Sequence, residues 1–82
     1  MKNIPTVFVV DDDPSVRKSL SRLLRSAGYE VEAFASGEEF LRREPCNEGG
    51  CIILDVRMRG LDGMGVQEKL SRQDYAMPVI FI

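Results

Sequence analysis

The pattern of apolar and polar residues divides the chain into short strands and amphipathic segments. Residues 7–10 and 51–54 are continuous apolar runs without polar alternation, which is typical of strands buried on both faces in a parallel sheet. Residues 79–82 form another apolar run. Residues 30–34 alternate instead, and this predicts a half-exposed strand near the edge of the sheet.

The longest amphipathic segment predicts a helix that begins after Asp13 and ends at Gly28. Asp13 is a suitable N-cap, and Pro14 suits the first helical position, where no backbone N–H is needed. Gly28 fits the C-cap position. Within the segment, apolar and basic residues fall on opposite faces. The apolar face comprises Val16, Leu20, Leu23, Leu24 and Ala27, and the basic face comprises Arg17, Lys18, Arg22 and Arg25.

Two further helical segments follow. Residues 36–39, Ser-Gly-Glu-Glu, form a capping box that predicts a short helix. Residues 64–71 have the pattern of a third helix, with Val66 and Leu70 directed inward, after a loop at 56–63. The order of elements is therefore β-α-β-α-β-α-β, which predicts an α/β fold with a doubly wound parallel sheet and right-handed crossovers.

Length, charge and hydropathy bound the organisation and the partners. The 82 residues are enough for one small domain, 1–82. The formal net charge is −2 and the basic residues are scattered along the chain, so we expect no nucleic-acid binding by this segment. We expect no membrane association, because the sequence has no signal peptide and no apolar run long enough to span a bilayer.

The cysteine and histidine content argues against a zinc site. Cys46 and Cys51 are the only cysteines, they do not form a Cys-x-x-Cys motif, and the chain has no histidine. We interpret both cysteines as free thiols in a reducing cytoplasm, with Cys51 serving as a small core residue. The expected location of the protein is therefore cytoplasmic.

Acidic residues directly follow both continuous apolar strands. Asp11, Asp12 and Asp13 come after the first strand, and Asp55 comes after the central one. The carboxyl ends of parallel strands face the same crevice, where two carboxylates about 4 Å apart repel by roughly 4 kcal/mol at an effective dielectric of ~20. A bound divalent cation would offset this repulsion. For Asp13, which precedes Pro14, we favour the role of helix cap.

The acidic motifs carry a resemblance to a known family. The segments Val9-Val10-Asp11-Asp12-Asp13, Leu54-Asp55-Val56-Arg57-Met58 and Asp62-Gly63, at these separations, resemble the receiver domain of two-component response regulators. The resemblance covers the whole chain and is closest to the nitrogen-fixation-regulator type. It implies a flavodoxin-like, doubly wound fold with five strands in the order 2-1-3-4-5.

The resemblance also implies roles for the acids. Asp55 would accept a phosphoryl group from the histidine of a sensor histidine kinase, since a carboxylate can form an acyl phosphate. Asp11, Asp12 and Asp55 would hold Mg²⁺, and the backbone carbonyl of Arg57 would complete the protein's share of the metal shell. Such a domain promotes its own phosphorylation and dephosphorylation without being classed as an enzyme. It would regulate transcription and contact DNA only through an output domain absent from these 82 residues.

Three departures from the family pattern qualify these roles. Arg59 stands after Met58, where receivers usually have proline. The family's switch Ser or Thr would follow directly after Ile82, and its phosphate-pairing Lys would come after a fifth strand; Lys69 is no substitute, because it lies in the third helical pattern. We therefore expect a receiver truncated after the fourth strand, with the last helix-strand-helix part missing.

This expectation has a consequence for association. Without a fifth strand, residues 79–82 would form a short, apolar and uncharged edge. Such edges pair with other strands, so we expect self-association of the truncated chain.

Two alternatives stay open. The first motif also resembles that of haloacid-dehalogenase-type phosphatases, with Asp11 as the nucleophile and Asp13 as the general acid. Pro14, which begins a helix at once, and Asp55, which would have no role, both argue against it. The second alternative is an interaction-only pseudo-receiver that never takes phosphate. The complete set of acids argues against that reading, while the missing Lys and switch hydroxyl favour it.

Overall fold

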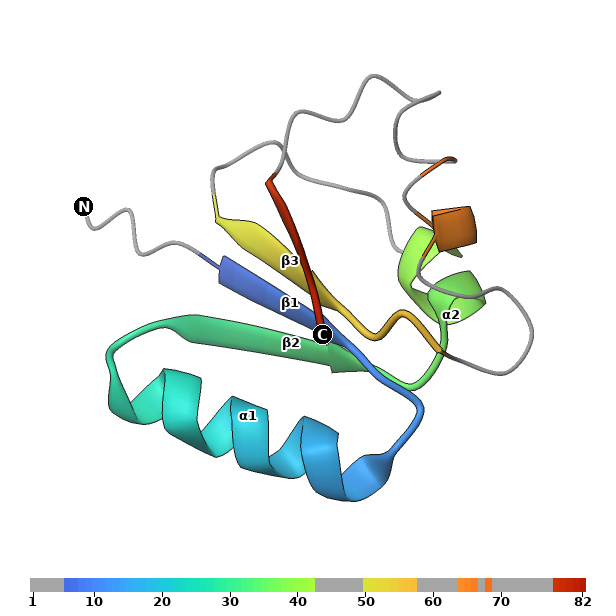
Figure 1. Cartoon of the computed structure of the whole chain (residues 1–82). Coiled ribbons are helices and arrows are strands. Elements are labelled where there is room, and N and C mark those ends of the chain that lie inside the picture. Colours follow the sequence, from blue (N-terminus) through green and yellow to red (C-terminus); the bar gives the residue numbers. More distant parts are fainter. Residues whose placement is uncertain (1–5, 43–49, 58–63, 67, 69–77) are drawn as a thin grey trace.

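A computed structural model describes residues 6–42, 50–57, 64–66, 68 and 78–82 of the chain (Figure 1). The elements in chain order are β1 (Thr6–Val10), α1 (Pro14–Ser26), β2 (Glu30–Phe34), α2 (Gly37–Arg42), β3 (Cys51–Leu54) and β4 (Val79–Phe81). Residues 64–66 and 68 are also helical. Several residues singled out in the sequence lie outside the described part, namely Cys46, Met58, Arg59, Asp62, Gly63, Lys69 and Leu70. No helix in the described part could cross a bilayer.

The four strands form one parallel sheet in the order β2-β1-β3-β4. This confirms the predicted α/β fold with a parallel sheet. Val10 at the end of β1 is opposite Phe34 on β2 and Leu54 on β3, so these three strands end at the same level. The segments that follow β1 and β3 therefore leave the sheet side by side.

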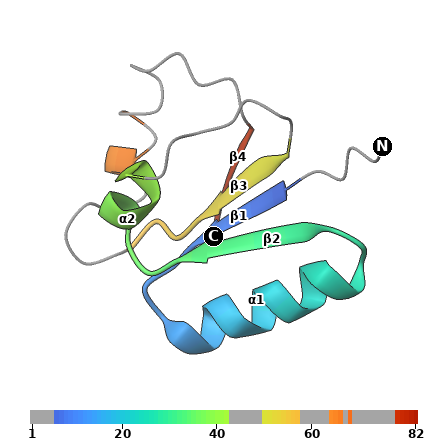
Figure 2. The same cartoon turned by 180° about the vertical axis from the view of Figure 1, so that it is seen from behind.

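Helices cover both faces of the sheet, as Figures 1 and 2 show from opposite sides. On the face covered by α1, buried Val7, Val9 and Val31 pack with Leu20, Leu24, Cys51 and Ile53. On the other face, buried Phe8, Val10, Phe40, Ile52, Leu54 and Val66 pack with Phe34, Leu41 and Val79. The sheet is thus doubly wound, and the inward position predicted for Val66 is confirmed, since this side chain is fully buried.

Three phenylalanine rings join α2 to the sheet. Phe8, Phe34 and Phe40 contact one another, with ring centroids 5.3–6.4 Å apart. Tilted and edge-on pairs of this kind each add about 0.5–1.5 kcal/mol beyond the burial of the rings. Ser36 N-caps α2 as predicted, because its Oγ accepts a hydrogen bond from the Glu39 N–H at 3.0 Å.

The limits of α1 agree with the prediction, but its rotation does not. Asp13 accepts a hydrogen bond from the Ser15 N–H at 2.9 Å and so caps the helix. Leu20 and Leu24 pack on the sheet and Ser21 is buried, whereas Leu23 is 64% exposed. The prediction of Leu23 on the apolar face was wrong. With 3.6 residues per turn, a stripe centred between Leu20 and Ser21 leaves Leu23 to solvent.

The edges of the sheet are β2 and, among the described strands, β4. The prediction of a half-exposed edge strand at 30–34 is confirmed. In and directly after β4, three apolar side chains are exposed, which are Ile80 (50%), Phe81 (38%) and Ile82 (52%). The central strand β3 is less enclosed than predicted, because Ile52 and Leu54 are buried while Cys51 and Ile53 are only half-buried.

Candidate metal and phosphoacceptor site

Three aspartates meet at the carboxyl edge of the sheet. Asp11 and Asp12 directly follow β1, and Asp55 directly follows β3. One carboxylate oxygen from each lies within 4.8 Å of the other two. The adjacent strand ends bring these side chains together, as expected for parallel neighbours. Asp13 is not part of this group, because it caps α1.

The loop after β1 holds Asp11 firmly. Its N–H donates to the carbonyl of Phe34 at 3.1 Å, and its Oδ1 accepts from the Asp13 N–H at 2.9 Å. Its carbonyl oxygen accepts a hydrogen bond from Nη1 of Arg17 at 2.8 Å. Arg17 was assigned to the basic face of the helix and not to the site. The six-residue separation is the only sequence signal that could have linked it to Asp11.

Asp55 is more accessible than Asp11. Its N–H donates to the carbonyl of Val10 at 3.0 Å, which extends the pairing of β1 and β3 by one residue. Its Oδ1 accepts from the Arg57 N–H at 3.0 Å, so a tight turn follows the strand. Asp55 is half-buried, whereas Asp11 is 3% exposed. The backbone of Arg57 thus lies beside the carboxylates; the metal-binding role of its carbonyl stays a prediction.

The crowding of acids changes the protonation of the buried one. Burial raises the pKa of Asp11 above its ordinary value, and the N–H of Asp13 opposes this effect by stabilising the carboxylate. The neighbouring Asp55 raises the pKa further through its charge and a side-chain hydrogen bond, and the charge of Asp12 also contributes. Without a cation, the group therefore retains a proton more readily than an isolated aspartate.

The donor set fits a hard divalent cation. Mg²⁺ prefers oxygen ligands, uses a few carboxylates, and keeps positions for water or phosphate oxygens. Three carboxylates within 4.8 Å of one another supply such oxygens, and a cation among them would relieve the repulsion that raises the pKa of Asp11.

A pocket lies next to these acids, beside the start of α2. Its lining residues are Asp12, Asp13, Ala35 and Ser36. Ala35 and Ser36 connect β2 to α2, so the pocket lies at the edge of the sheet to which the carboxylates point. It provides space for a substrate group beside Asp12. The sequence analysis treated Ser36 only as a helix cap and did not predict this position.

Comparisons with known proteins identify the class of this domain and then its family. A doubly wound parallel sheet with an acidic cluster at its carboxyl edge is the architecture of receiver domains, and the family model for the response regulator receiver domain matches residues 7–82. The chain belongs to this family.

The relatives support the same assignment. The chain is 44% identical over 80 residues to the transcriptional regulatory protein TdiR of Thauera aromatica, covering 98% of this chain and 35% of TdiR. It is 38% identical over 76 residues to the transcriptional regulatory protein FixJ of Bradyrhizobium diazoefficiens, covering 93% of this chain and 37% of FixJ. The chain therefore spans about a third of the length of these curated relatives. The resemblance to the nitrogen-fixation-regulator type is confirmed.

A solved structure shows the same fold. The structure of the response regulator StyR matches with a TM-score of 0.91 and 49% identity, covering 95% of this chain and 39% of StyR. The protein is thus a receiver domain of the two-component response regulators.

Proposed function

We propose that this receiver domain accepts a phosphoryl group on Asp55 from the histidine of a sensor kinase in the cytoplasm. The observation that carries the proposal is the position of Asp55 at the end of β3, half-buried and grouped with two other aspartates. We assign Mg²⁺ to Asp11, Asp12, Asp55 and the backbone carbonyl of Arg57. When bound, Mg²⁺ would neutralise charge on the transferring phosphoryl group.

In the proposed reaction, an Asp55 carboxylate oxygen attacks the phosphorus of the kinase phosphohistidine. A P–O bond forms, the P–N bond breaks, and its electron pair stays on the imidazole, which then takes a proton from solvent. Asp55 suits this role because its Oδ1 is oriented by the Arg57 N–H while the residue stays accessible. The pocket beside Asp12 would admit the kinase histidine.

The geometry does not favour Asp11 as the nucleophile. Asp11 is buried, its Oδ1 accepts from the Asp13 N–H, and its pKa is raised, so it is a poorer nucleophile than an accessible carboxylate. The phosphatase alternative also needs Asp13 as a general acid. The Asp13 side chain instead caps α1 through the Ser15 N–H.

Phosphorylation with a small phosphodonor tests the proposal. With acetyl phosphate and Mg²⁺, we expect acid-labile, hydroxylamine-sensitive incorporation at Asp55, which mass spectrometry after borohydride reduction would locate. Asp55→Asn should abolish it and preserve the circular dichroism spectrum. Label that survives Asp55→Asn and disappears in Asp11→Asn would favour the phosphatase alternative. A folded chain that takes no label with either donor or kinase would favour the interaction-only receiver.

The proposal extends to partners. The names of TdiR and FixJ describe transcriptional regulators, so we propose that the phosphorylated domain regulates transcription, with DNA contacted by a separate output domain. We also propose that the 82-residue chain self-associates through β4, since Ile80, Phe81 and Ile82 expose apolar side chains there and unpaired apolar edges pair with other strands.

A further inference from the structure

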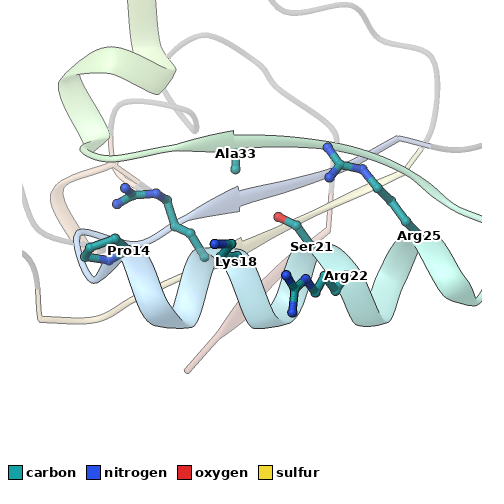
Figure 3. Close-up of a pocket in the computed structure, with 7 residues that line it drawn as sticks. Pro14, Lys18, Ser21, Arg22, Arg25 and Ala33 are labelled. Atoms are coloured by element: carbon teal, nitrogen blue, oxygen red, sulfur yellow. The ribbon is translucent and has the colours of Figure 1, made fainter.

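A basic groove runs between α1 and the edge strand β2, on the opposite side of α1 from the exposed Leu23. It has a volume of about 400 Å³, and the residues that define it are Arg17, Lys18, Ser21, Arg22, Arg25 and Ala33. Figure 3 shows the Ser21 hydroxyl and the Arg25 guanidinium directed from α1 toward β2. Ala33 is the β2 residue that faces the groove, and its small side chain leaves the space open. None of these residues belongs to the aspartate site.

The four basic side chains of the groove lack acidic partners within the described part of the chain. Arg17 donates to the carbonyl of Asp11 and Arg25 to the carbonyl of Val31, and both acceptors are backbone atoms. The structure records no ion pair or hydrogen bond for the side chains of Lys18 and Arg22. A row of like charges on a chain of net charge −2 carries a repulsive cost that a bound anion would remove.

The charges form a line and not a single cluster. Arg17 and Arg25 are eight residues apart on α1, and at 1.5 Å per residue the row is about 12 Å long. An extended peptide advances about 3.3 Å per residue, so roughly four peptide residues match the row. A single phosphate or carboxylate would contact only part of it.

Backbone pairing with β2 is restricted on this side. Arg25 donates to the carbonyl of Val31 at 3.3 Å, which occupies an acceptor that an added strand would need. A ligand in the groove would therefore be recognised through its side-chain charges and not by extending the sheet.

We propose that this groove binds a short acidic segment of a partner protein, about four residues long and rich in Asp and Glu. Carboxylates accept charge-assisted hydrogen bonds from Arg and Lys, and the row of donors sets the register of the segment. A nucleic acid fits less well, because Asp12 and Asp13 follow directly beyond the Pro14 end of the groove and would repel a phosphate backbone that continued past it.

Fluorescence anisotropy on the whole chain tests the proposal. The probe is a labelled hexapeptide of alternating Asp and Glu, with the Asn and Gln peptide of equal length as the neutral control. We expect the acidic peptide to bind and the neutral one not to bind. Arg22→Glu should weaken binding about tenfold, since one charge-assisted contact is worth about 1.5–3 kcal/mol. Arg42→Glu, on the exposed end of α2, makes the same change in net charge and should have little effect.

Further arms separate the outcomes. Lys18→Glu is a second groove variant, and circular dichroism establishes that each variant is folded. Amide resonances of Ser21 and Ala33 should shift when the acidic peptide is added. Equal losses in Arg22→Glu and Arg42→Glu, or no binding at low salt, would overturn the proposal. A single-stranded oligonucleotide of equal charge that binds more tightly than the peptide, and loses affinity in Arg22→Glu, would instead make the groove a nucleic-acid site.

Discussion

Asp11 is the residue that makes the candidate site sensitive to pH and to cations. Its carboxyl group is buried beside two other aspartates, and burial, followed by the charge of Asp55, raises its pKa while the Asp13 N–H opposes the rise. The folded chain therefore holds this proton to a higher pH than the unfolded chain, in which aspartate titrates near 3.9. Folding and proton binding at Asp11 are coupled.

We expect Asp11 to make the metal-free protein less stable as the pH rises. The stabilising difference in proton binding is complete below the unfolded pKa and is lost as the pH rises through the raised pKa of folded Asp11. Urea unfolding between pH 4 and 7 would measure it. Asp11→Asn cannot ionise, so the difference between the two profiles isolates this residue from the other acids.

Magnesium should act in the opposite direction. Because the cation and the proton compete for the same carboxylate, Mg²⁺ should raise the melting temperature more at pH 7 than at pH 4, and less in Asp11→Asn. Parallel pH profiles for the two proteins, or a melting temperature unaffected by Mg²⁺, would contradict the coupling.

At the level of elements, a close contact before β3 fixes its approach to β1. Gly50 has a φ of +99°, and a Cβ added there would overlap the backbone oxygen of Thr6. Only glycine satisfies both the left-handed backbone and the missing side chain.

Gly50→Ala should therefore lower the free energy of unfolding by roughly 2 kcal/mol or more, through strain and displacement of β3. Gly28→Ala is the matched control, because Gly28 has a φ of +98° with no atom near its added Cβ, and should cost only about 1 kcal/mol. Chemical denaturation of both variants would compare the costs. Equal losses would show that the contact with Thr6 is unimportant.

The sequence predicts the elements better than their rotation. Asp13, Pro14 and Gly28 predict α1 correctly because capping is local chemistry. The exposure of Leu23 depends on where β1 and β2 lie beneath the helix, which the helical period alone does not contain. The same rotation directs Arg17 toward the loop after β1, so neither its bond to Asp11 nor the basic groove could be predicted.

For the whole molecule, the site could be predicted further than the surface. Parallel strands end at one edge, so the positions of Asp11 and Asp55 after two apolar runs predict their proximity. The groove and the pocket beside Ser36 combine residues from elements whose separation depends on helix packing. They could be found only in three dimensions.

The apolar edge at β4 predicts how the chain behaves in solution. We expect light scattering to show self-association that increases with concentration, because Ile80, Phe81 and Ile82 are exposed beside the outermost described strand. Phe81→Lys places a charge on this edge and should shift the population toward monomer. A monodisperse monomer whose scattering is unchanged by Phe81→Lys would rule out this surface.

The parallel register also determines when the domain can form during synthesis. Val10 pairs with Leu54, about 44 residues further along the chain. A ribosome that adds roughly 5–20 residues per second needs about 2–9 s to make that connection. Throughout this interval β1 lacks its central partner while carrying apolar side chains on both faces, which makes the nascent chain a candidate for chaperone binding. Asp11 and Asp55 therefore come together only after translation has passed the central strand.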